Sequence, residues 1–160
     1  MRIGHGYDAH RFADPRTDQR PLVLGGITIP HDRGLKAHSD GDAVIHALCD
    51  ALLGAVGEAD IGQHFPDSDP ALQNVDSARL LERVDALLRQ QGWQMANADL
   101  TVLAQQPRLG PHIPAMRERL AALMALSPGQ INIKASTTEK MGFVGREEGI
   151  AVHAVVLVTR

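Results

Sequence analysis

The apolar residues of the chain recur with two different periods, and each period predicts one kind of element. Alternating apolar and polar positions predict strands over residues 3–12, 22–29 and 130–136 and within 93–105, and a mostly apolar run predicts a further strand over 150–159. Apolar residues three and four apart predict helices over 42–53, 77–91 and 113–126. This order predicts an α+β fold with a mixed sheet and helices on one face, in a single domain over residues 1–160.

Some local patterns add detail. Gly25 and Gly26 interrupt the strand at 22–29 and predict a bulge or a close backbone approach there. The strand at 150–159 is apolar on both sides, so its second face needs cover from a neighbouring subunit or from helices. The segments 57–70 and 137–149 are rich in turn residues and are expected to be loops.

The helix at 42–53 carries polar residues on a stripe of its own. Ile45, Cys49 and Leu52 belong to its apolar stripe, whereas Asp42, His46 and Asp50 follow each other four apart. Ser39 or Asp40 is expected to cap the first turn.

Composition narrows the function. Hydrophobic residues make up 44% and charged residues 22%, which is typical of a soluble globule. The net charge of -3 and the absence of a basic run argue against nucleic acid as a partner. No stretch approaches the ~20 apolar residues of a membrane span. The lone Cys49 fits a core position and a reducing, cytoplasmic setting, and the strand pattern begins too early for a signal peptide.

The first chemical candidate is a metal site. Asp8 and His10 are two apart on a strand, so both side chains point to one side, and His46 projects from the polar stripe of the helix. Two imidazoles and one carboxylate leave a position open on a tetrahedral zinc ion, as catalysis requires. Taken alone, Asp-x-His is more often polar surface than a ligand pair.

Three further segments each allow two interpretations. His38 and Ser39 precede a helix, where phosphate binds, although simple capping is favoured there. The carboxylates of 60–70 could bind sugar hydroxyls, but they are equally typical of turns. The segment 134–140 could hold phosphates and magnesium through its hydroxyls and Glu139, or could be an ordinary strand end. P-loop and dinucleotide-binding motifs are absent.

Taken together and in this order, the segments resemble the 2-C-methyl-D-erythritol 2,4-cyclodiphosphate synthase family. The resemblance runs nearly from end to end and includes RIGHGYDAHRF, HSDGD followed by His46, DIGQHFPDSDP, AQQPRLGPHIP and NIKASTTEKMGFVGREEGI. It implies a homotrimer of α+β subunits around a central β-lined axis, with active sites between neighbours. It also implies a metal-dependent phosphorus–oxygen lyase that closes a cyclic diphosphate and releases CMP in isoprenoid precursor synthesis.

The resemblance also implies roles for individual residues. Zinc or a similar divalent ion would bind Asp8, His10 and His46, and magnesium or manganese would bind Glu139 with substrate phosphates. His38 and Thr137 match the catalytic positions. The positions that match contacts to the cytidine diphosphate substrate, besides Asp8, His10, His38, Thr137 and Glu139, are Ser39, Asp60, Ile61, Gly62, Phe65, Asp67, Asp69, Ala104, Gln105, Gln106, Pro107, Arg108, Leu109, Gly110, Ser136 and Thr138. Phe143 and Arg146 match residues near the trimer axis, where an isoprenoid diphosphate can be held.

The sequence departs from the family's usual pattern in the cytosine loop, and two other functions stay open. The family often has Lys at Arg108, a bulkier apolar residue at Gly110 and Thr at Ser136. Without the resemblance, a zinc phosphoesterase that attacks with metal-activated water is the leading hypothesis. A trimeric binding protein with a structural metal is the third, although no evident fourth ligand closes the site.

Overall fold

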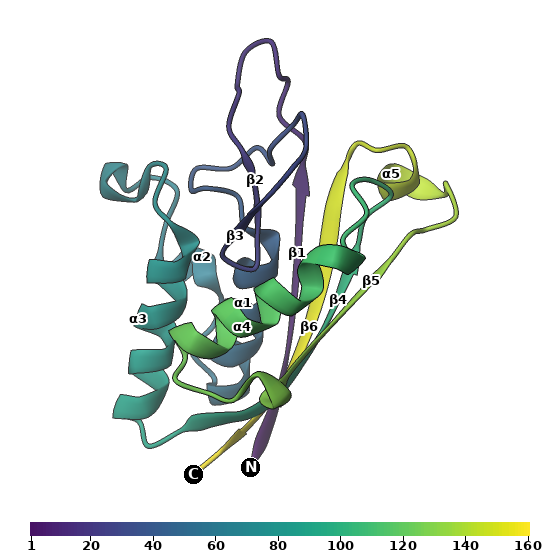
Figure 1. The fold of residues 1–160 in the computed structure, drawn as a ribbon. Coiled ribbons are helices and arrows are strands. Elements are labelled where there is room, and N and C mark those ends of the chain that lie inside the picture. The colour runs from purple at the N-terminus through teal and green to yellow at the C-terminus, as the bar shows by residue number, and fades with distance from the viewer.

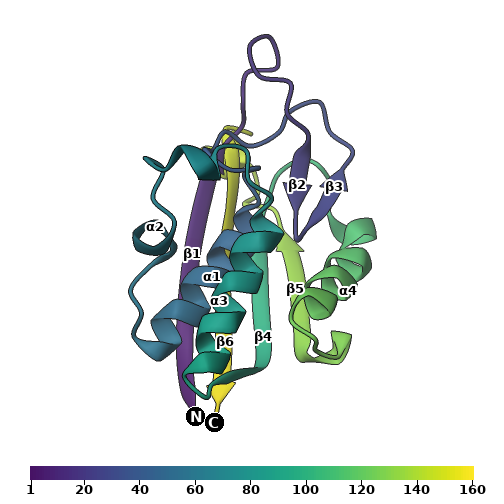
Figure 2. The same cartoon turned by 90° about the vertical axis from the view of Figure 1, so that its left-hand side faces the viewer.

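The computed structural model describes residues 1–160 and has helices packed on one face of a mixed sheet (Figures 1 and 2). The strands are β1 (Arg2–Arg11), β2 (Leu22–Leu24), β3 (Ile27–Ile29), β4 (Gln94–Leu103), β5 (Ile131–Ser136) and β6 (Gly149–Thr159). The helices are α1 (Ala43–Val56), α2 (Ile61–His64), α3 (Ser77–Gln90), α4 (Ile113–Leu123) and α5 (Gly142–Gly145). Short 3₁₀ helices occupy Pro70–Leu72, Gly110–His112 and Pro128–Gln130. The predicted α+β class and the mixed sheet are confirmed.

The main sheet has the strand order β1-β6-β4-β5. β6 is antiparallel to both of its neighbours, whereas β4 and β5 run parallel. Figure 2 shows α1 and α3 in front of β1, β6 and β4, and α4 in front of β5. The core therefore lies between this helical layer and the inner face of the sheet, and Cys49 is fully buried in it.

The outer face of the sheet carries no helical layer (Figures 1 and 2). Ile3 and Tyr7 of β1 and Val155 of β6 are exposed there, at 71%, 47% and 40%. Helix packing is therefore not the cover for the second apolar side of β6. These side chains remain open in the single chain.

The segment 22–29 folds differently from the expectation of one interrupted strand. It forms the hairpin of β2 and β3, with Gly25 and Gly26 in the turn at φ values of 61° and 73°. Glycine adopts this left-handed backbone without the steric cost that a side chain adds. The sequence pattern missed the reversal because three-residue strands are too short to show alternation of their own.

Other corrections concern helix ends and loops. The N-cap of α1 is Asp42, not Ser39 or Asp40, because its side chain accepts the amide hydrogen of Ile45. The loop expected at 57–70 contains α2, and the loop expected at 137–149 contains α5. Both helices have four residues, which is too short for a helical period to appear in the sequence.

Asp42 also joins the hairpin to α1. Its fully buried carboxylate accepts hydrogen bonds from the amides of Gly25 and Gly26, at 2.9 and 2.6 Å, besides that of Ile45. Burial raises the pKa of this carboxyl group, and the three amide donors oppose that shift. The polar stripe of α1 thus begins with a structural carboxylate and not with a solvent-facing one.

We expect Asp42→Ala to lower the free energy of unfolding by about 3 kcal/mol, because it removes a helix cap and leaves buried amides without an acceptor. Asp76→Ala is the matched control, since exposed Asp76 caps only α3 and its loss costs about 1 kcal/mol. Urea unfolding of both variants measures the difference. Equal losses would contradict the assigned role of Asp42.

Candidate metal centre

The approach of β1 to α1 determines which side chains meet. Gly4 and Gly6 face α1, and a Cβ atom at either would lie within 2.0 Å of a carbonyl oxygen of that helix, Ala51 O or Ala47 O. Asp8 and His10 continue the same face of β1, because alternate residues of a strand share a side. β1 therefore packs against the backbone of α1 at its two glycines. Its metal-donor side chains, Asp8 and His10, follow on the same face.

Asp8, His10 and His46 converge on one point, as expected from the sequence. His10 Nε2 lies 2.9 Å from Asp8 Oδ2 and 3.1 Å from His46 Nδ1, and the third side of the triangle is 3.3 Å. Ligands 2.0–2.1 Å from a tetrahedral zinc ion stand roughly 3.3 Å apart. The three donor atoms are thus spaced as ligands of one small ion.

Hydrogen bonds behind the imidazoles determine which nitrogen of each ring is free. His10 Nδ1 lies 3.0 Å from the carbonyl oxygen of Lys36, which can only accept, so Nδ1 carries the hydrogen. His46 Nε2 lies 2.9 Å from Ser77 Oγ, whose own hydrogen is donated to Asp40, and 3.2 Å from Ser39 Oγ. These hydroxyls suit the tautomer that carries its hydrogen on Nε2. In these tautomers both rings turn a lone pair toward Asp8, as metal ligands require.

The electrostatics of the cluster favour a cation. Burial opposes ionisation of Asp8, but the neighbouring imidazoles of His10 and His46 prevail and hold its pKa well below the usual range. Burial lowers the pKa of His10, whereas the Asp8 carboxylate more than offsets this and raises it. Asp8 Oδ2 is buried, and its polar neighbours are the ring nitrogens of His10 and His46, at 2.9 and 3.3 Å. A buried anionic oxygen that faces two imidazole nitrogens fits a metal ligand.

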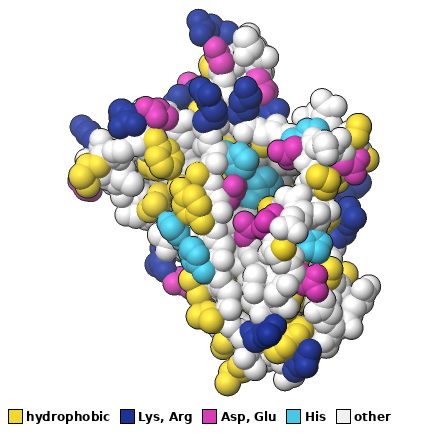
Figure 3. Space-filling view, turned by 180° about the vertical axis from the view of Figure 1, so that it is seen from behind, with side chains coloured by type: hydrophobic (Ala, Val, Ile, Leu, Met, Phe, Trp, Pro, Cys, Tyr) yellow, Lys and Arg dark blue, Asp and Glu magenta, His cyan; other side chains and the backbone are white.

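The cluster lies in a cavity of about 410 Å³. Figure 3 shows His and acidic side chains gathered at the middle of this face of the molecule, directly below Lys and Arg side chains. Six further residues singled out from the sequence line the same cavity, namely His38, Ser39, Ile61, Gly62, Phe65 and Asp67. The metal cluster and these segments, separate in the sequence, thus share one pocket.

Neighbouring side chains position the walls of this pocket. Asp50 accepts the amide hydrogen of Ile61 at 2.8 Å and so ties α2 to α1. The guanidinium of Arg83 lies 4.7 Å from the ring centre of Phe65. Asp60 and Asp69 are not among the lining residues, and each caps a short helix. The carbonyl oxygen of Asp69 lies 3.1 Å from His38 Nε2.

The remaining predicted residues lie around two other cavities. The first, of about 330 Å³, is lined by Ala104, Gln105, Pro107, Arg108, Leu109, Gly110, Ser136 and Thr137, with Gln106 outside its lining. The second, of about 170 Å³, is lined by Thr138 and Phe143. Thr137 Oγ1 donates to Glu139 at 3.3 Å, and Arg146 pairs with Glu148 at 2.7 Å. The single chain thus puts Thr137 and His38 in different pockets.

Sequence reasoning missed three contributors to the metal pocket. Lys36 lines it and accepts from His10, while Ser77 and Asp40 lie behind His46. Ser77 was expected only as the start of a helix and Asp40 only as a possible cap, and Lys36 was not singled out. Only the position of Lys36, two residues before His38, offered a signal.

No helix of this chain has the length and apolar character needed to cross a bilayer.

Two proteins that share one name are similar to this chain over nearly its whole length. A protein of Nitrosococcus oceani named 2-C-methyl-D-erythritol 2,4-cyclodiphosphate synthase is 57% identical over 99% of this chain and 98% of its own length. A protein of the same name from Bacillus cereus is 53% identical over 100% of this chain and 99% of its own.

Solved structures agree in fold. A CDP-bound 2C-methyl-D-erythritol-2,4-cyclodiphosphate synthase superposes with a TM-score of 0.88 at 39% identity, over 99% of this chain and 100% of that one. The bifunctional IspDF of Campylobacter jejuni gives 0.92 at 43% identity, and the 98% of this chain that matches corresponds to 42% of that protein. Residues 1–159 match the YgbB family, and the chain belongs to this family.

Proposed function

We propose that the protein converts 4-diphosphocytidyl-2-C-methyl-D-erythritol 2-phosphate to 2-C-methyl-D-erythritol 2,4-cyclodiphosphate and releases CMP. One observation carries the proposal: the triangle of Asp8, His10 and His46 opens into the cavity that His38, Ser39 and Phe65 line. The names of the relatives and the CDP bound to a similar structure support it. We also propose that this reaction takes place in the cytoplasm and is a step of isoprenoid precursor synthesis.

The reaction brings two anionic groups together, since the 2-phosphate attacks the β-phosphorus in line. Positioning and charge neutralisation lower that barrier, and no covalent enzyme intermediate is needed. A divalent ion, when bound, supplies positive charge beside the phosphates. Asp8, His10 and His46 would hold it, with ring orientations fixed by Lys36 O and Ser77 Oγ. Ile61, Gly62 and Phe65 line the same cavity and would form the wall against which the erythritol packs.

The second half of the site comes, in this proposal, from a neighbouring subunit of a homotrimer. Two observations support it: the outer face of β1 and β6 is exposed, and Thr137 lies in a cavity separate from His38. Residues 104–110 with Ser136 would hold the cytosine, and Glu139 a magnesium or manganese ion. Phe143 and Arg146 would face an isoprenoid diphosphate near the axis.

Incubation of the metal-loaded protein with the cytidyl substrate tests the activity. We expect equimolar cyclic diphosphate and CMP by ³¹P NMR and chromatography. His46→Ala removes one of three ligands and is expected to lose both bound metal and nearly all turnover. Linear phosphate products would instead favour a phosphoesterase, and tight CDP binding without turnover would favour a binding protein.

Subunit mixing tests the shared site. His46→Ala and Glu139→Gln should each be inactive alone, because one damages the metal cluster and the other the second half. Random trimers formed from both should regain about one quarter of wild-type activity, since about one interface in four combines two intact halves. The activity is measured after mild unfolding and joint refolding, with each variant refolded alone as control. No recovery from a correctly assembled mixture would contradict a site between subunits.

The hydrogen bond from His46 to Ser77 predicts a change in metal affinity. Ser77→Ala should weaken zinc binding about tenfold, because loss of a hydrogen-bond partner behind a ligand typically costs 10–100-fold. Competition with a chelating dye measures the affinity without any assay of turnover. Ser127→Ala is the control, since Ser127 only caps a remote 3₁₀ helix. Identical zinc affinities in the two variants would contradict the role of Ser77.

A further inference from the structure

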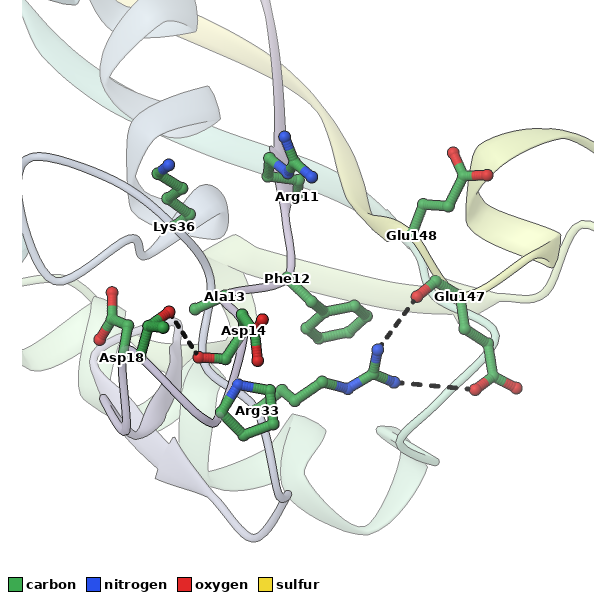
Figure 4. A pocket seen from close by; sticks show the side chains of 11 residues that line it. Arg11, Phe12, Ala13, Asp14, Asp18, Arg33, Lys36, Glu147 and Glu148 are labelled. Carbon is green, nitrogen blue, oxygen red and sulfur yellow. Dashed lines mark hydrogen bonds and ion pairs between the residues drawn. The ribbon is translucent and has the colours of Figure 1, made fainter.

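The largest cavity of the molecule, about 950 Å³, lies next to the metal pocket and is lined mainly by charged residues (Figure 4). All four of its carboxylates are engaged with arginines, in the pairs Asp14–Arg16, Asp18–Arg20, Glu147–Arg33 and Glu148–Arg146. Arg33 also lies over the ring of Phe12, 4.6 Å from its centre. The negative charge around this cavity is therefore already neutralised by local partners.

Two cations of the lining, Arg11 and Lys36, take part in no ion pair. Both side chains are exposed. The Arg146 hydrogen bond is the main cause of the lowered pKa of Glu148, and Arg11 adds only a lesser effect. Arg20 likewise dominates the lowered pKa of Asp18, with a lesser effect of Lys36. Each carboxylate thus has a closer partner than these two cations.

Arg11 and Lys36 face the same side of a short strand pairing. The Lys36 amide donates to the Arg11 carbonyl at 2.8 Å, next to the antiparallel bridge between Phe12 and Leu35. Residues opposite each other in such a pairing direct their side chains to one face, and like charges there repel. Figure 4 shows both side chains pointing the same way, away from Phe12. No ion pair within the chain relieves this repulsion.

The location connects this pair to the metal pocket. Lys36 lines both cavities, and its carbonyl oxygen fixes the ring of His10. An anion held between Arg11 and Lys36 would therefore lie at the shared rim. A guanidinium offers a planar fork that matches phosphate oxygens, and an ammonium adds a mobile point charge, so the pair suits a phosphate better than a single carboxylate.

We propose that Arg11 and Lys36 form an anion-binding site for a phosphate or diphosphate group at the rim between the two cavities. The group has two possible sources. It can belong to the substrate of the metal pocket, in which case this part rests on the proposed function. It can also belong to a separate phosphorylated molecule in the larger cavity.

A titration of metal-loaded protein with inorganic phosphate, followed by ³¹P NMR at low salt, tests the site itself. Arg11→Met combined with Lys36→Met should weaken phosphate binding about tenfold or more, because charge-assisted hydrogen bonds are lost. Arg79→Met with Arg119→Met removes equal charge from exposed positions on α3 and α4, and should stay within about twofold of the wild type. Equal phosphate affinity in all three proteins would overturn the proposal.

Turnover then identifies the source of the phosphate. A roughly tenfold rise in KM in the Arg11/Lys36 variant assigns the group to the substrate. An unchanged KM together with weakened phosphate binding assigns it to a separate phosphorylated molecule. Failure of the wild type to form the cyclic product would refute the proposed function, whereas the phosphate titration would still decide on the anion site.

Discussion

The close approach of β1 to α1 is the constraint on which the metal centre depends. Gly4 and Gly6 let the strand lie against the carbonyl oxygens of Ala51 and Ala47, where any side chain would collide. His46 precedes Ala47 on that helix, so the same approach brings its ring to the donors on β1. A larger strand–helix separation would leave Asp8 and His10 as a pair of surface groups. Backbone packing thus determines whether these three donors can meet on one metal ion.

Hydrogen bonds around the cluster also orient its two imidazole rings. The Lys36 carbonyl and the Ser77 hydroxyl each accept a hydrogen from one imidazole, so both lone pairs face the Asp8 carboxylate. Asp40 accepts from Ser77 and continues the chain of hydrogen bonds away from the site. Such partners limit ring rotation and raise ligand basicity. The three donors could therefore hold a cation without reorientation of the rings.

The sequence predicted the parts of the site that local periodicity describes. Asp8 and His10 share a strand face, and His46 belongs to a stripe of α1 distinct from its apolar one. Periodicity could not show that Ser77, 31 residues further on, meets His46, since that contact depends on how α3 packs against α1. It also could not show that Asp42 binds the β2–β3 turn, because that bond spans separate elements. The residues of 104–110 were singled out through family resemblance alone.

X-ray absorption at the zinc edge of the zinc-loaded protein distinguishes an open metal centre from a closed one. We expect two nitrogen ligands and one carboxylate oxygen at about 2.0–2.2 Å, with a fourth ligand that phosphate replaces. A zinc ion enclosed by four protein ligands, or a spectrum that phosphate leaves unchanged, would contradict an open metal centre made of Asp8, His10 and His46.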